Sequence, residues 1–148
     1  MKIVNGDLIK LALNGEFDVI IHGCNCFNTM GAGIAKQIQS KFPEAYAVDC
    51  TTLKGDKNKL GTITIANIER NNIKFDIVNG YTQYSFGYST ANYNAIRLVM
   101  QRVKYLYSGK RIGYPLIGAG LAGGDWNIIS SIINNELQDE DHTCVKYN

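Results

Sequence analysis

The stretch that decides the fold is His22-Gly-Cys-Asn-Cys-Phe-Asn-Thr-Met-Gly-Ala-Gly-Ile-Ala35, called the first loop below. It follows the apolar run 18–22, whose length and β-branched residues predict a buried strand. After Gly31 the apolar residues take the spacing of a helix, with Ile34 and Ile38 on one face. A glycine-containing loop between a buried strand and a helix is typical of an open α/β sheet, which binds its ligands at such junctions.

A second junction of the same kind lies near the C-terminus. The strand expected at 112–117 is followed by Gly118-Ala-Gly-Leu-Ala-Gly-Gly124 and then by a helix at 126–137. We call residues 117–124 the second loop. The other expected elements are a helix at 8–13, a helix from Gly31 that Pro43 ends, strands at 62–68 and 73–77 with a hairpin turn at Asn71-Asn72, a helix at 91–107 and a strand at 142–147.

These elements predict one α/β domain over residues 1–148 with a mixed sheet, because strands alternate with helices and two strands form a hairpin. The chain has 148 residues, within the usual ~100–200 for one domain, and 45% of them are hydrophobic. With 15 Lys and Arg against 13 Asp and Glu, its net charge is +2. This argues against a nucleic-acid binder that acts through a basic field.

No apolar run is long enough to span a bilayer, so no membrane partner is expected. Residues 1–4 do not resemble a secretory signal, which favours a cytoplasmic location, or the host cytoplasm if the protein is virus-encoded. We expect the four cysteines to be reduced. Cys24 and Cys26 lack zinc-site spacing and read as small residues beside a strand end, so no metal is predicted.

Both loops have the chemistry of an anion site. Glycine lets main-chain N–H groups approach a ligand, and the N-terminus of a helix favours negative charge. Two such loops at one edge of a sheet would clamp a diphosphate and its ribose, although each glycine cluster can also be only a tight turn. Neither loop has the pattern of a Walker A or G-x-G-x-x-G motif, which disfavours ATP hydrolysis and Rossmann-type cofactor binding.

Three segments together resemble the macro domain family. They are Asn5-Gly-Asp-Leu8, the first loop, and Pro115-Leu-Ile-Gly-Ala-Gly-Leu121, and they occur in the order of the family over nearly the whole chain. Ile21-His-Gly-Cys-Asn-Cys26 followed by Met-Gly-Ala-Gly-Ile-Ala resembles the branch with the yeast-type ADP-ribose 1''-phosphate phosphatase and the terminal ADP-ribose glycohydrolases. The resemblance implies a three-layer α/β/α fold with a central mixed sheet that binds ADP-ribose in a cleft at its crest.

The resemblance also implies where the ligand lies. Asp7 matches the acid that receives the adenine amino group, although an N-cap of helix 8–13 is the alternative. Asn25 and Asn28 would face the distal ribose. The further residues that the resemblance assigns to ADP-ribose are Leu8, Gly31, Ala32, Gly33, Ile34, Thr82, Ile117, Gly118, Ala119, Gly120 and Leu121.

The catalytic candidates are His22, Asn25, Asn28 and Asp125. His22 matches a histidine of the phosphatase-like branch and can exchange a proton near pH 7, but a structural histidine beneath the loop is the alternative. Asp125 is the acid nearest the second loop, and its alternative is to cap the following helix. Tyr81, Tyr84, Phe86 and Tyr88 form an aromatic segment that either covers the distal ribose or belongs to the core.

The deglycosylase branch has a lysine nucleophile in the segment that matches 81–86 and an acid where this chain has Ala122. Since residues 81–86 contain no lysine, the leading hypothesis is a monomeric, cofactor-independent hydrolase of ADP-ribose 1''-phosphate. The alternatives are a non-catalytic ADP-ribose-binding module and a hydrolase of ADP-ribosyl esters that works without the lysine. The expected partner is ADP-ribose or ADP-ribose 1''-phosphate, with no nucleic acid or membrane.

Overall fold

The computed structural model describes residues 1–87 and 90–147, and within them it forms a six-stranded mixed sheet. The sheet has the order β1-β6-β5-β2-β4-β3. Its strands are β1 (Lys2–Asn5), β2 (Val19–Cys24), β3 (Ile63–Arg70), β4 (Ile73–Tyr81), β5 (Arg111–Tyr114) and β6 (Asp141–Lys146). Its helices are α1 (Leu8–Leu13), α2 (Gly33–Lys41), α3 (Pro43–Asp49), α4 (Tyr93–Tyr107) and α5 (Trp126–Glu136), with a 3₁₀ turn at Lys57–Lys59.

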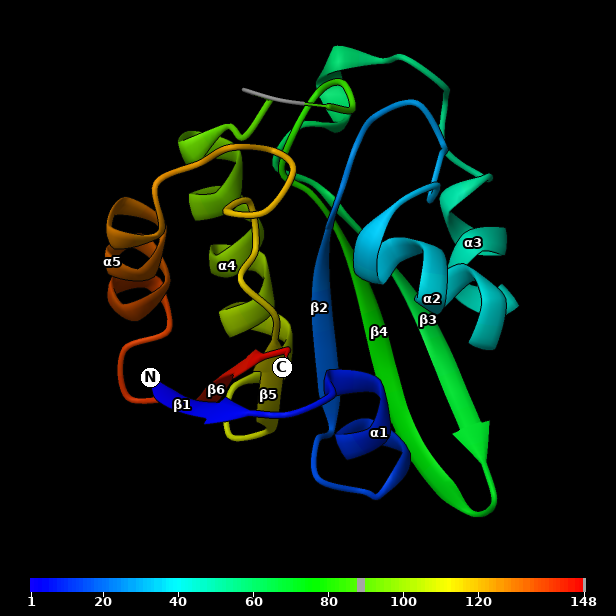
Figure 1. Ribbon diagram of the computed structural model, residues 1–148, viewed down its shortest axis with the longest axis vertical. Coiled ribbons are helices and arrows are strands. Elements are labelled where there is room, and N and C mark those ends of the chain that lie inside the picture. The colour runs from blue at the N-terminus through cyan, green and yellow to red at the C-terminus, as the bar shows by residue number, and fades with distance from the viewer. Residues whose placement is uncertain (88–89, 148) are drawn as a thin grey trace.

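Helices cover both faces of the sheet, so the predicted three-layer α/β/α fold is confirmed (Figure 1). Successive side chains of β2 point to opposite faces. Val19 and Ile21 pack in one core cluster with α4 and α5, whereas Ile20 packs in the other with α1, α2 and α3. The central strands are thus buried on both faces of the sheet, and a ligand can reach only the loops that follow them.

The predicted hairpin is confirmed. β3 and β4 pair antiparallel, and both Asn71 and Asn72 at the turn have positive φ angles, of 51° and 67°. Asparagine reaches this left-handed region more easily than most residues, because its short side chain bonds to nearby backbone. The other strand pairs are parallel, which makes the sheet mixed.

Several elements differ from the sequence prediction, among them β4, which was expected at 73–77 and continues to Tyr81. Pro43 ends α2 and also begins α3, where its missing N–H costs nothing because the first helical residue has no acceptor to bond. The strand expected at 112–117 ends at Tyr114, because Pro115 has no N–H for the ladder. β1 was not predicted, because its four residues are all exposed and do not alternate between apolar and polar.

The parallel register brings the carboxyl ends of neighbouring strands together. Cys24, the last residue of β2, lies beside Tyr81, the last residue of β4, and β5 pairs with β2 on its other side. The chain segments that leave these strands meet at one end of the sheet, the upper end in Figure 1. Within the described residues, no helix has the length and apolar composition needed to cross a membrane.

Candidate functional site

A cavity of about 600 Å³ lies between the two loops, and we call it the main cavity. Its walls come from residues of the first loop and of the second, together with Gln83 and Phe86 after β4. A second space of about 350 Å³, the side cavity, is lined by Asp7, Leu8 and Tyr147. Both cavities share Gly33, Ile34, Pro115 and Leu116 as lining residues, so they are adjacent, and we call the two together the elongated cleft.

The N-terminus of α2 opens into the main cavity without a side-chain cap. Ala32 occupies the cap position and offers no side-chain acceptor, whereas Asp7, Asn92 and Asp125 cap α1, α4 and α5. The first residues of α2, 33–35, line the cavity, and first-turn N–H groups have no acceptor within a helix. This end of the cavity therefore presents free donors and the positive end of a helix dipole to an anion.

The second loop closes on itself through glycine. The Gly124 N–H donates to Gly118 O at 2.7 Å, and Gly118 has a φ angle of 74°. A Cβ atom at position 124 would lie 2.6 Å from Gly118 O, so only glycine allows this closure. Gly118, Gly120 and Leu121 line the main cavity, but Ala119 does not. The loop forms the wall opposite α2.

His22 does not line the main cavity and is completely buried. Its Nε2 donates to Asn79 Oδ1 at 2.6 Å, and the Asn79 amide donates in turn to Ala45 O and Thr64 Oγ1. Burial lowers the pKa of His22 to about 4, against a partial opposing effect of the Asn79 bond. His22 is therefore a neutral residue beneath the loop at pH 7, as the structural alternative proposed, and is not placed for catalysis.

Asn25 and Asn28 lie on opposite sides of the first loop. Asn25 lines the main cavity, but its amide already donates to Thr29 O and Oγ1, and its Oδ1 accepts the Phe27 N–H. Asn28 does not line the cavity. Its amide donates to Thr52 O at 3.0 Å, and its Oδ1 accepts from the buried Lys59 at 2.6 Å. The loop thus turns the Asn28 side chain toward Lys59 and away from the main cavity, where the distal ribose was expected.

We expect Asn28 to act on stability. Asn28→Gly should lower the free energy of unfolding by about 2 kcal/mol, because the Lys59 ammonium loses an acceptor. Asn28→Ala should cost about 1 kcal/mol more, because Asn28 has a φ angle of 57° and a Cβ is strained there. Urea unfolding measures both. Asn71, exposed and also at positive φ, is the matched control: its Gly variant should lose nothing. Equal stability of Asn28→Gly and the parent would mean that the hydrogen bond between Lys59 and Asn28 does not stabilise the fold.

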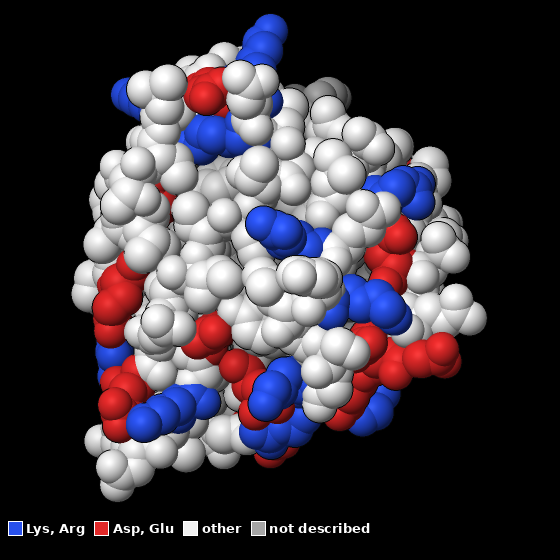
Figure 2. Space-filling model, turned by 180° about the vertical axis from the view of Figure 1, so that it is seen from behind, with Lys and Arg blue, Asp and Glu red and all other residues white. Residues whose placement is uncertain are grey.

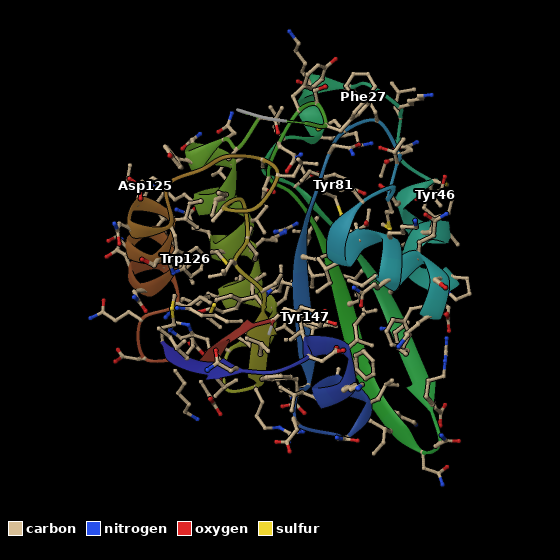
Figure 3. All side chains as sticks on the ribbon, in the orientation of Figure 1. Phe27, Tyr46, Tyr81, Asp125, Trp126 and Tyr147 are labelled. Atoms are coloured by element: carbon tan, nitrogen blue, oxygen red, sulfur yellow. The ribbon has the colours of Figure 1, made fainter. Side chains whose placement is uncertain are left out.

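The two acidic candidates both cap helices. Asp125 accepts from the Asn127 N–H at the start of α5, outside both cavities, well to the left of α2 in Figure 3. Its capping alternative is confirmed, and its catalytic assignment loses its geometric basis. Asp7 also caps its helix, but both bonds, from Ile9 N and Lys10 N, go to Oδ1. Oδ2 is left for a donor in the side cavity, so capping and ligand binding are compatible.

The aromatic segment divides between core and cavity. Tyr81 is buried and donates to Asp49 at 2.7 Å, and Tyr84 donates to Gly55 O. Phe86 lines the main cavity and is 63% exposed. Tyr88 lies outside the described residues. Of these aromatic residues, Phe86 lies at the main cavity, whereas Tyr81 packs in the core.

Thr82, which was predicted to contact the ligand, lies behind the wall of the main cavity, whereas Ala122, at the position of the missing acid, is part of that wall. Thr82 is buried, does not line either cavity, and packs under Gly23, where an added Cβ would lie 2.6 Å from the Thr82 Oγ1. Ala122 lines the main cavity, and its carbonyl accepts the Thr90 and Ala91 N–H groups. The Thr82 Oγ1 is buried and has no hydrogen-bond partner among the described residues, so its predicted contact with the ligand stays a prediction.

Sequence reasoning missed Gln83 and Tyr147 as lining residues. Gln83 lies in the segment 81–86, where the resemblance implies the lysine of the deglycosylase branch. Tyr147 follows β6 and is largely exposed at the Asp7 end of the cleft (Figure 3). The signal for both was their position just after the carboxyl end of a parallel strand.

The main cavity has no lysine or arginine among its described lining residues, which fits an anion site made by backbone N–H groups. On the opposite side of the molecule from the view of Figure 1, basic and acidic residues are interspersed, and no wide patch of one sign appears (Figure 2). Across residues 1–87 and 90–147, no three His, Cys, Asp or Glu side chains come together as metal ligands. Burial raises the pKa of the Cys24 thiol, which lines the main cavity, well above its usual value. The thiol is therefore protonated and a poor nucleophile.

The fold and the cleft define a class of protein, a three-layer α/β domain with a cavity between two glycine loops at one end of its sheet. The family model described as "Macro domain" matches residues 21–133. The chain therefore belongs to the macro domain family. It is 34% identical over 139 residues to "Uncharacterized 17.5 kDa protein in tk-vs intergenic region" of Enterobacteria phage T4, covering 90% of this chain and 88% of the phage protein.

Other relatives match less of the sequence or only the fold. A segment of 48 residues is 42% identical to an ADP-ribose 1''-phosphate phosphatase of Aspergillus oryzae, covering 32% of this chain and 22% of that protein. A Bacteroides thetaiotaomicron protein of unknown function has a TM-score of 0.78 and 26% identity, over 99% of this chain and 98% of that one. Thermosipho africanus DarTG in complex with ADP-ribose has a TM-score of 0.71 and 17% identity, over 99% and 41% of the two chains.

Proposed function

We propose that this chain binds ADP-ribose in the elongated cleft and hydrolyses ADP-ribose 1''-phosphate to ADP-ribose and phosphate. The observation that carries the binding is the uncapped N-terminus of α2, which opens into the main cavity opposite the glycines of the second loop. A diphosphate between them would accept hydrogen bonds from the backbone N–H groups of α2, and the helix dipole would favour its negative charge. Such a site needs no basic patch, in agreement with a net charge of +2.

The two ends of the cleft suit the two ends of the ligand. In the side cavity, the free Oδ2 of Asp7 would accept the adenine amino group, and Tyr147 offers an aromatic face to the base. At the other end, Asn25, Gln83 and Phe86 surround the place of the distal ribose. The hydrolytic half of the proposal is supported by the segment shared with the phosphatase of Aspergillus oryzae.

A binding module without turnover is the second candidate. It is favoured by the position of His22, Asn28 and Asp125, none of which lines the main cavity. Calorimetry with ADP-ribose and a phosphate-release assay with ADP-ribose 1''-phosphate, run on the same preparation, separate the candidates. Binding with phosphate release supports the phosphatase, and binding without it leaves the module. Absence of ADP-ribose binding would refute both.

Asp7 provides a test of the ligand's orientation. Asp7→Asn should weaken ADP-ribose binding about 10-fold, because a charge-assisted hydrogen bond to the adenine is lost. The unfolding free energy should change by less than about 0.5 kcal/mol, since asparagine caps helices as well as aspartate does. Asp125→Asn is the matched control, a second helix cap outside the cleft. If both variants bind ADP-ribose as the parent does, adenine does not contact Asp7.

A further inference from the structure

The main cavity contains few polar side chains, and their hydrogen bonds differ. Amide and hydroxyl side chains on its wall belong to Asn25, Thr29 and Gln83, within the part of the chain that the structure describes. Asn25 uses both amide hydrogens on Thr29 and its oxygen on the Phe27 N–H, and Thr29 Oγ1 accepts one of these bonds. Gln83 differs, because its Oε1 has no partner among the described residues, while its Nε2 donates to Ser85 O at 2.9 Å.

The backbone and this bond hold the Gln83 amide in place. Gln83 follows the end of β4 and forms an isolated antiparallel bridge with Ala91. The Cys26 thiol also donates to Gln83 O at 3.6 Å. Because Nε2 is engaged, the amide cannot turn to exchange its oxygen and nitrogen without losing a bond. Oε1 is therefore a fixed acceptor at the end of the cavity where Asn25 and Phe86 lie.

Among the described residues that line the main cavity, no side chain would take a proton from water near pH 7. His22 lies outside the cavity with its pKa lowered to about 4, and the Cys24 thiol stays protonated. A glutamine does not take up a proton, but its oxygen can accept a hydrogen bond from water and direct the lone pair of that water. Orientation of this kind lowers a barrier without a base, because a misplacement of ~1 Å can cost ~100-fold in rate.

We propose that Gln83 is a catalytic residue that orients the attacking water, a role that rests on the proposed phosphatase activity. The water oxygen forms a bond to phosphorus, and the bond from phosphorus to the 1'' oxygen breaks. One proton of the water passes to a phosphate oxygen and then to the 1'' oxygen, so that ADP-ribose and inorganic phosphate leave. The substrate itself carries the proton, and the reaction consumes only water.

Steady-state phosphate release and ADP-ribose calorimetry on Gln83→Ala, Gln83→Glu and the parent test this role. Gln83→Ala should lower kcat about 100-fold, while KM and the Kd for ADP-ribose change less than about 3-fold. Gln83→Glu should also lower kcat, because a carboxylate cannot donate the bond to Ser85 O that holds the acceptor in place, and it should raise KM by repelling the phosphate. Gln138→Ala, at an exposed glutamine outside the cleft, is the matched control and should resemble the parent.

The outcomes separate this role from the proposed function. A parent protein that binds ADP-ribose but releases no phosphate would overturn the phosphatase activity, and the role of Gln83 with it. An active parent whose Gln83→Ala variant keeps its kcat would overturn the role of Gln83 alone. If that variant keeps its kcat but has a higher KM and a weaker Kd for ADP-ribose than the control, Gln83 binds the ribose and does not orient water.

Discussion

Gly31→Glu is expected to weaken ADP-ribose binding by more than about 100-fold. Gly31 lines the main cavity beside the uncapped start of α2, where the proposed diphosphate lies. A carboxylate ~6 Å from a phosphate charge, at an effective dielectric constant of ~20, costs about 3 kcal/mol. The same carboxylate would also compete with the ligand for the free N–H groups of α2. Calorimetry with ADP-ribose measures the loss.

The neutral variant Gly31→Gln isolates the charge from the added volume. No atom lies within 4 Å of a Cβ built at Gly31, and its φ angle is not in the left-handed region, so both side chains fit without strain. Gly31→Gln should therefore lose much less affinity than Gly31→Glu, and raised salt should reduce the difference between them. If the two variants bind ADP-ribose equally, the diphosphate does not lie at the start of α2.

The free energy of unfolding is expected to fall steeply as the pH is lowered from about 6.5 to about 4. His22 and His142 are both buried, and burial is the main cause that lowers each pKa from 6.5 to about 4. Between these pH values the unfolded chain binds protons that the folded chain does not, so stability rises with pH and is lost on acidification. For His22 the shift corresponds to about 3 kcal/mol.

Urea unfolding at several pH values between 4 and 7 tests this expectation. The slope of the unfolding free energy against pH measures how many more protons the unfolded chain binds than the folded chain. His22→Gln should lower that number by about one, whatever its effect on stability at pH 7. His142 bonds to Tyr114 on another strand pair, at 2.6 Å, so His142→Gln provides an independent, equal step. A slope that His22→Gln leaves unchanged would mean that His22 titrates normally in the folded protein.

The local sequence pattern predicted most helices and strands, because the spacing of apolar residues and the identity of turn residues are properties of neighbouring positions in the chain. The hairpin at Asn71-Asn72 and both strand–loop–helix junctions were visible in this way. β1 escaped prediction because its four residues are exposed, and the continuation of β5 was overestimated at Pro115. The helix cap at Asp125 was recognised as an alternative, and the structure confirms it.

The sequence by itself determined the α/β class, the family and the two glycine loops, because these depend on residue type and spacing along the chain. Only the tertiary structure decided which side chains line the main cavity. Asn25 and Asn28 are three residues apart in one loop, yet the positive φ of Asn28 and the ammonium of Lys59 turn the second one away from the cavity. His22 is withdrawn by a bond to Asn79, 57 positions later, and such distant partners leave no local pattern.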